Sequence, residues 1–76
     1  MTSQNFIEIF SALLTQTPAG TLSEATKFKE LPEWSSLLAL SLMALVEDEC
    51  DVLLKGDDIR NAETLGDLFS AVERNR

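Results

Sequence analysis

Two adjacent serines, Ser35 and Ser36, are the side chains of this chain best suited to carry a chemical group. They stand between a segment with proline and tryptophan, residues 31–34, and an apolar run from Leu37 to Val46 that is expected to be helical. The start of a helix presents unpaired backbone N–H groups and the positive end of the helix dipole, and both favour an anion such as a phosphate-linked group. A serine at the same place also serves as a plain helix cap. Both interpretations stay open on these residues alone.

Other chemistry is limited by the residue types that are missing. The chain has no histidine and a single cysteine, Cys50. An internal disulfide and a Cys/His zinc site are therefore excluded, as are nucleophilic mechanisms that need an imidazole base. The acidic group Glu47, Asp48, Glu49 and Asp51 lacks the glycine turn and the terminal glutamate of a calcium loop. We expect no metal site and no autonomous catalysis, so the protein is not expected to be an enzyme.

Length and charge limit the class of protein further. The 76 residues make one domain, residues 1–76, which is too small to wall a deep substrate cavity. The formal net charge of −7 disfavours binding to nucleic acid or to an anionic membrane. The longest apolar run is too short to cross a bilayer, and the first five residues lack the basic region of a secretory signal. We expect a soluble, cytoplasmic protein with no nucleic-acid partner and no membrane insertion.

The spacing of apolar residues predicts helices and no strand. Thr2 or Ser3 can cap the start of the first helix, and the apolar face of that helix comprises Phe6, Ile9, Phe10, Leu13 and Leu14. Residues 15–35 form a long connection after it. Long loops are often pinned by their own side chains. We expect this one to be fastened to the helices by Phe28, Leu31 and Trp34.

Three further helices follow the long connection. The second starts near Ser36 and runs to about Asp48, and a short third helix is expected to be capped by Asp57. The last helix opens at Thr64, where Asp67 three residues later completes a pattern close to a capping box. The sequence therefore predicts an all-α fold: a small four-helix bundle of three longer helices and one short helix, with a long first loop.

The second helix is apolar on every side, because Ser41 is the only polar residue between Leu37 and Val46. One stripe must face the core, and the remainder is exposed, covered by the long loop or covered by a partner. We expect the core stripe to hold Leu37, Leu40 and Ala44, with some of Leu42, Met43, Leu45 and Val46.

The order of these elements and the motif Trp34-Ser35-Ser36-Leu37 resemble the acyl carrier protein family, most closely stand-alone carriers whose modification motif is Trp-Asp-Ser-Leu. The likeness covers roughly residues 4 to 74 and includes the segments 26–31, 46–52 and 64–68. The family fold is a four-helix bundle. The resemblance implies a carrier of acyl or aminoacyl groups, held as thioesters on a 4′-phosphopantetheine arm that coenzyme A donates to one serine.

By match to the motif, the attachment residue is Ser36, and Ser35, Leu37 and Trp34 complete the cofactor-binding set. The chain departs from the family at Ser35, where the motif has an aspartate that handles the pyrophosphate of coenzyme A with magnesium. Glu33 is the nearby carboxylate that we expect to replace its charge.

The resemblance also implies partners. These are a phosphopantetheinyl transferase, an acyl-loading ligase, and an acyl-using transferase or synthase, which we expect to meet a monomer. They are expected to dock on the second helix, through Leu38, Ser41, Leu42, Leu45, Glu47 and Asp48. Because the middle of that helix is apolar, docking should be more hydrophobic and less salt-sensitive than is usual for carriers. The alternative is an unmodified carrier-like interaction module that associates with itself through the apolar second helix.

Overall fold

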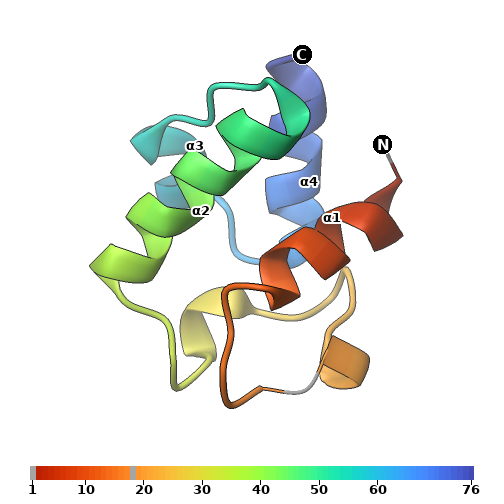
Figure 1. Cartoon of the computed structure of the whole chain (residues 1–76), viewed down its shortest axis with the longest axis vertical. Coiled ribbons are helices and arrows are strands. Elements are labelled where there is room, and N and C mark those ends of the chain that lie inside the picture. The colour runs from red at the N-terminus through yellow and green to blue at the C-terminus, as the bar shows by residue number, and fades with distance from the viewer. Residues whose placement is uncertain (1, 18) are drawn as a thin grey trace.

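The computed structural model describes residues 2–17 and 19–76, and within them it contains four α-helices, two short 3₁₀ helices and no strand. The elements are α1 (Ser3–Ser11), η1 (Ala19–Thr21), η2 (Phe28–Glu30), α2 (Ser36–Cys50), α3 (Gly56–Asn61) and α4 (Leu65–Arg74). The predicted all-α bundle of three longer helices and one short helix is confirmed. Figure 1 shows α1 beside α2 and α4 behind α1, with the long connection below them.

Each longer helix begins at a side chain that caps it. The hydroxyl of Thr2 accepts a hydrogen bond from the Asn5 N–H at 3.1 Å, at the start of α1. At α4, Thr64 Oγ1 accepts from the Asp67 N–H, and the Asp67 carboxylate accepts from the Thr64 N–H, each at 3.1 Å. This reciprocal pair is the predicted capping box, with aspartate in place of glutamate.

The start of the short helix differs from the prediction. We expected Asp57 to cap α3, but the capping position is Lys55 and the helix begins at Gly56. The carboxylate that acts there is that of Asp58, which accepts a hydrogen bond from the Lys55 N–H at 3.0 Å. Asp58 is the third residue of α3, so its carboxylate reaches back to the N–H of the capping residue, as in a capping box.

The core is one cluster to which all four α-helices and the long connection contribute. Its largest fully buried side chains are Phe6, Phe10, Phe28, Leu42, Leu54, Leu65 and Leu68. Burial of each such side chain contributes about 1.5–3 kcal/mol relative to exposure. Leu31 and Trp34 are half-buried against the same cluster. The prediction that Phe28, Leu31 and Trp34 fasten the long connection is confirmed.

The face that α2 turns to the core differs from the one we expected. Leu37 is 74% exposed, Leu40 is 62% exposed and Ala44 is also exposed, so the prediction that these three face the core is wrong. The core side of α2 carries Leu42 and Val46, flanked by Ala39, Met43 and Cys50, so the part of the prediction that named Leu42 and Val46 is confirmed.

The residues one turn further along α2 explain which of its faces is buried. A stripe through Leu40 and Ala44 continues into Glu47 and Asp48, because positions three and four apart share a face. Burying that stripe would carry two carboxylates toward the core, where unpaired charges are costly. The stripe through Leu42 and Val46 continues into Glu49 and Cys50, so it carries one carboxylate instead of two, and Cys50 is half-buried.

Among the described residues, none of the helices is both long enough and apolar enough to span a lipid bilayer.

Candidate functional site

The predicted attachment residue, Ser36, is the first residue of α2 and is exposed. The preceding Ser35 is the capping residue, with extended backbone angles of φ −157° and ψ 170°. Its Oγ accepts a hydrogen bond from the Leu38 N–H at 3.1 Å, and its carbonyl accepts one from the Ala39 N–H at 3.0 Å. The two serines therefore have different positions: the hydroxyl of Ser35 caps the helix, whereas that of Ser36 lies on the surface beside it.

The start of α2 is electrostatically suited to an anion. The helix is 15 residues long and has no acidic residue in its first turn to offset the positive end of its dipole. Helix geometry also leaves the N–H groups of Ser36 and Leu37 without an intrahelical acceptor. A negative charge held there gains about 0.3–1 kcal/mol at an exposed position. The arrangement can orient an anion held beside Ser36.

Trp34 holds the chain that leads into α2. Its ring stacks on Phe10 with a centroid distance of 6.3 Å and an interplanar angle of 18°. It also meets Phe28 edge-on, with a centroid distance of 4.8 Å. Trp34 is thus an anchor between the long connection and α1. Of the two other residues predicted beside the attachment serine, Leu37 lies on the surface and Ser35 caps the helix.

Glu33 ties the beginning of the long connection to its end. Its carboxylate accepts hydrogen bonds from the Thr15 N–H at 2.8 Å and the Gln16 N–H at 2.9 Å. It also accepts from the hydroxyls of Thr15 at 3.1 Å and Thr17 at 2.8 Å. These bonds, the one from the Thr15 N–H foremost, lower the pKa of Glu33 from 4.5 to about 2.

These bonds form a tether between the two ends of the long connection, a role of Glu33 that the sequence did not indicate. The Glu33 carboxylate is committed to the loop and is not free to replace the aspartate that the carrier motif has at position 35. The donors at residues 15–17 lie 16 to 18 positions away in the chain. No local pattern marks such a pairing, so sequence reasoning had no signal for it.

The six residues predicted to dock partners occupy different environments. Leu42 is fully buried in the core, so its place in the docking set is wrong: the side of α2 that carries it packs inward. Glu47 and Asp48 are exposed, and Leu38, Ser41 and Leu45 are half-buried. The apolar residues that do lie on the outer face of α2 are Leu37, Leu40 and Ala44, which the prediction had assigned to the core.

Cys50, the single cysteine, lies half-buried at the end of α2. Burial raises the pKa of its thiol, and the neighbouring Glu49 charge raises it further. The thiol is therefore protonated at neutral pH. Within residues 2–17 and 19–76, no three side chains of the His, Cys, Asp or Glu types are grouped closely enough to hold a metal ion.

Comparison of the chain with protein-family models, with curated proteins and with solved structures gives no match. The resemblance to acyl carrier proteins therefore rests on the residues quoted above and on the order of the helices.

Proposed function

We propose that this protein is a discrete acyl carrier, in which the hydroxyl of Ser36 bears a 4′-phosphopantetheine arm donated by coenzyme A. The observation that carries the proposal is the position of Ser36: an exposed hydroxyl at the first residue of α2, within the segment Trp34–Leu37 that resembles the carrier motif. When bound, the arm supplies a thiol that holds acyl or aminoacyl groups as thioesters. The protein then needs no catalytic group of its own, which agrees with its lack of histidine.

The residues around Ser36 have separable roles in this proposal. The free N–H groups of the first turn and the helix dipole orient the phosphate. Ser35 keeps the helix start intact through its bond to the Leu38 N–H at 3.1 Å. The aromatic packing of Trp34 on Phe10 fixes where the helix begins relative to the core. An attached group is thereby presented at one defined corner of the bundle.

Partner enzymes would meet the outer face of α2 next to that corner. This outer face comprises Leu37, Leu40 and Ala44, with Glu47 and Asp48 at its far end. The partners are a phosphopantetheinyl transferase, an acyl-loading ligase, and an acyl-using transferase or synthase, acting on a cytoplasmic monomer. Since three of the five positions are apolar, the association should depend less on salt than docking through carboxylates alone.

The test is covalent modification of the purified protein. It is incubated with coenzyme A, magnesium and a broad-specificity phosphopantetheinyl transferase, and its intact mass is measured. We expect a gain of one phosphopantetheinyl group, lost in Ser36→Ala and retained in Ser35→Ala, which is the matched control at the adjacent serine. No gain with several transferases, or a gain that persists in Ser36→Ala, would contradict the proposal.

A second candidate function is an unmodified module that associates with itself through the outer face of α2. The observation that favours it is the exposure of Leu37 and Leu40, because solvent-exposed apolar patches often mark interaction surfaces. Serine in place of the motif aspartate at position 35 also favours an unmodified module. Sedimentation over a range of concentrations separates the two functions. A dimer that is dissociated by Leu40→Glu supports the self-associating module, and a monomer at every concentration excludes it.

A further inference from the structure

The side of α2 that faces α1 forms a groove with it, which borders the outer face of α2 and shares Ala44 and Asp48 with that face. One hollow of about 510 Å³ lies between Ile9 and Ala12 on the α1 side and Glu49 and Cys50 at the end of α2. A second hollow of about 420 Å³ is lined by Leu13 and by residues of α2 that include Ala44, Leu45 and Asp48. Residue numbers rise along α1 while they fall along α2, so the helices run antiparallel and the two hollows follow one another along a single seam.

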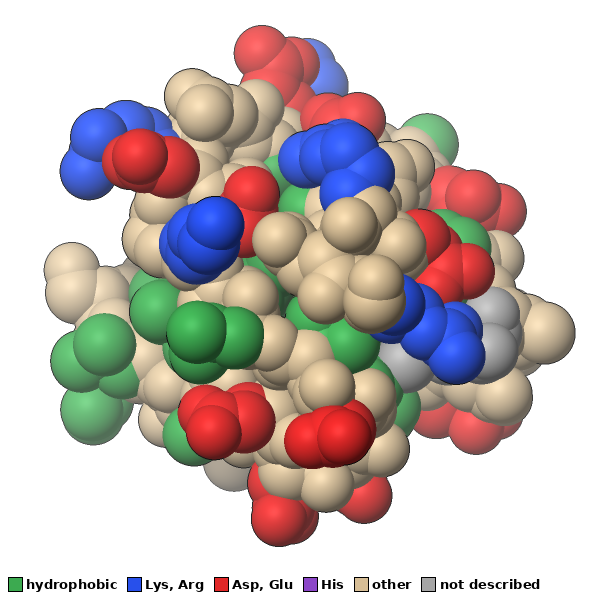
Figure 2. Space-filling model, turned by 90° about the horizontal axis from the view of Figure 1, so that it is seen from above, with side chains coloured by type: hydrophobic (Ala, Val, Ile, Leu, Met, Phe, Trp, Pro, Cys, Tyr) green, Lys and Arg blue, Asp and Glu red, His purple; other side chains and the backbone are tan. Residues whose placement is uncertain are grey.

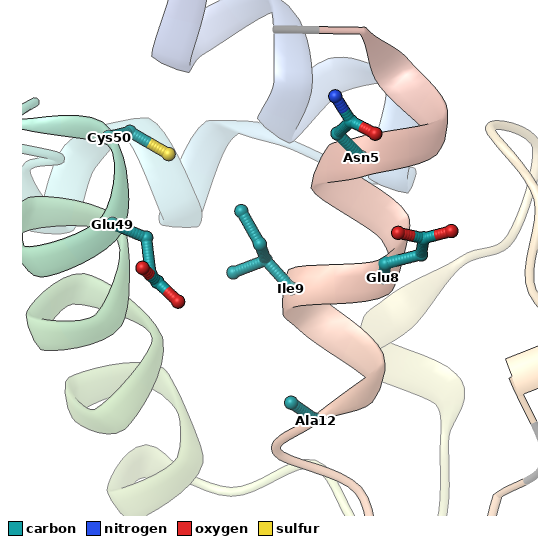
Figure 3. Close-up of a pocket in the computed structure, with 6 residues that line it drawn as sticks. All are labelled: Asn5, Glu8, Ile9, Ala12, Glu49 and Cys50. Carbon is teal, nitrogen blue, oxygen red and sulfur yellow. The ribbon is translucent and has the colours of Figure 1, made fainter.

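An apolar strip runs along the α1/α2 groove, and polar residues that include Asn5, Glu8 and Glu49 also line its first hollow. Ile9, Leu13, Leu45 and Cys50 are half-buried along it, and their exposed portions face the open seam. Figure 3 shows the side chains of Ile9, Glu49 and Cys50 pointing into the space between the helices, whereas the Glu8 carboxylate lies toward the outer side of α1. From Asn5 to Leu13 the groove is roughly 12 Å long, at 1.5 Å per residue, which is slightly more than two helical turns.

The charged residues of the two helices that form the groove have one sign. The helices α1 and α2 together carry four carboxylates, Glu8, Glu47, Asp48 and Glu49, and no lysine or arginine. The charge of Arg76 does act on the Cys50 thiol, but Arg76 is paired with Glu73 at 2.9 Å. In Figure 2 the Lys and Arg side chains lie in the upper and middle parts of the view, and only acidic charged side chains lie along its lower margin.

We propose that the α1/α2 groove docks an amphipathic helix of a partner protein, with an apolar ridge flanked by lysine or arginine. A helix packs well into the groove between two others, and apolar residues spaced three and four apart would reach its floor. The flanking cations would pair with Asp48 and Glu49, which line the two hollows. Charge argues against a second copy of this chain as the occupant, because each copy carries a net charge of −7.

This inference goes beyond the carrier proposal and does not depend on it, since Ser36 lies at the other end of α2. Ser36→Ala should therefore leave docking in the groove unchanged. A failure of the modification assay would leave the groove proposal standing, and the reverse also holds.

The probe is a synthetic helical peptide of about 14 residues, with leucine and alanine at positions i, i+3, i+4 and i+7 and lysine on both flanks. It is titrated into the ¹⁵N-labelled full chain while amide chemical shifts are recorded. We expect the largest shifts at Ile9, Ala12, Leu45 and Cys50. We also expect the affinity to fall about tenfold when salt rises from about 0.05 M to about 0.5 M, because the flanking pairs are exposed.

Two charge reversals make a matched pair for this experiment. Glu49→Lys changes a carboxylate that lines the groove, and Glu63→Lys makes the same change of net charge at an exposed residue ahead of α4. Both side chains are exposed, so the fold should be kept in each variant. We expect Glu49→Lys to weaken peptide binding about fivefold and Glu63→Lys to leave it within about twofold, as for one exposed ion pair.

Four results would overturn the inference. They are an absence of binding, shifts centred on Leu37 and Leu40 instead of the groove, and an equal loss of affinity in the two reversals. The fourth is a homodimer, detected by sedimentation, for which the amide shifts place the interface in the groove. The occupant would then be a second copy of the chain.

Discussion

The capping bond at the start of α2 leads to a quantitative prediction for position 35. In Ser35→Ala the acceptor for the Leu38 N–H, now at 3.1 Å, is removed. Loss of such a cap costs typically about 1 kcal/mol, within a range of about 0.5–2 kcal/mol. For a domain of this size the melting temperature should fall by about 4–8 °C for each kcal/mol.

Ser35→Asp should behave in the opposite way. Aspartate caps as well as serine does, and its charge adds about 0.3–1 kcal/mol at the positive end of the dipole. The first turn of α2 has no other acidic residue that would repel it. We therefore expect a melting temperature at or above that of the parent, with a gain that shrinks in 1 M salt. Since aspartate is also the residue of the carrier motif, the carrier proposal predicts faster phosphopantetheinylation of this variant.

Thermal unfolding followed by circular dichroism measures the stabilities, and intact mass against time measures the modification rate. Ser70→Ala is the matched control, because Ser70 is exposed within α4 and no capping bond is lost there. If Ser35→Ala melts together with the parent, the hydroxyl does not stabilise the helix start. If Ser35→Asp melts higher but is modified more slowly than the parent, the comparison with the carrier motif is refuted.

Three further predictions concern the core, the loop tether and the glycines. Phe28→Ala should lower the free energy of unfolding by about 3–5 kcal/mol in urea titration, because a fully buried ring is removed, and a loss below about 1 kcal/mol would contradict this. The pKa of Glu33 is about 2 in the folded protein, against 4.5 ordinarily, so its contribution to stability is complete above pH 4.5 and lost as the pH falls through 2. As the pH is lowered from 4.5 to 2, the free energy of unfolding of Glu33→Gln, measured by urea titration, should therefore fall less than that of the parent. If the two proteins lose stability in parallel with pH, the Glu33 carboxylate does not stabilise the loop. Gly56→Ala should raise the free energy of unfolding by about 0.4–1 kcal/mol, and with it the melting temperature, because the added Cβ meets open space. Gly66→Ala should lose that gain, because its Cβ would lie 3.1 Å from the Glu24 carbonyl oxygen, and equal melting temperatures of the two variants would contradict the contact.

Local features of the fold were predictable from the sequence where one side chain acts on a backbone group close to it. The capping box of Thr64 and Asp67 is such a case, because the partners are three residues apart. The predicted start of α2 near Ser36 is another. The third helix shows the limit of this reasoning, since Asp57 was the predicted cap and the structure uses the carboxylate of Asp58.

The candidate site was predictable in part, because some of its features depend only on residues close together in the chain. Its position in the chain follows from a short motif at the start of an apolar run. The sequence did not show which serine caps the helix and which one is free, because either hydroxyl can cap until the backbone angles at Ser35 are known. The Glu33 tether was out of reach, since its donors at residues 15–17 come near only when the long connection closes on itself.

By itself, then, the sequence determined the helical class, the capping box of α4 and the approximate start of α2, all of which depend on neighbours within about one helical turn. Only the tertiary structure decided which side of α2 is buried. Leu37, Leu40, Leu42 and Val46 are equally apolar, so periodicity cannot rank the stripes to which they belong. The choice depends on what each stripe meets across the core and on the carboxylates that would be carried inward with it.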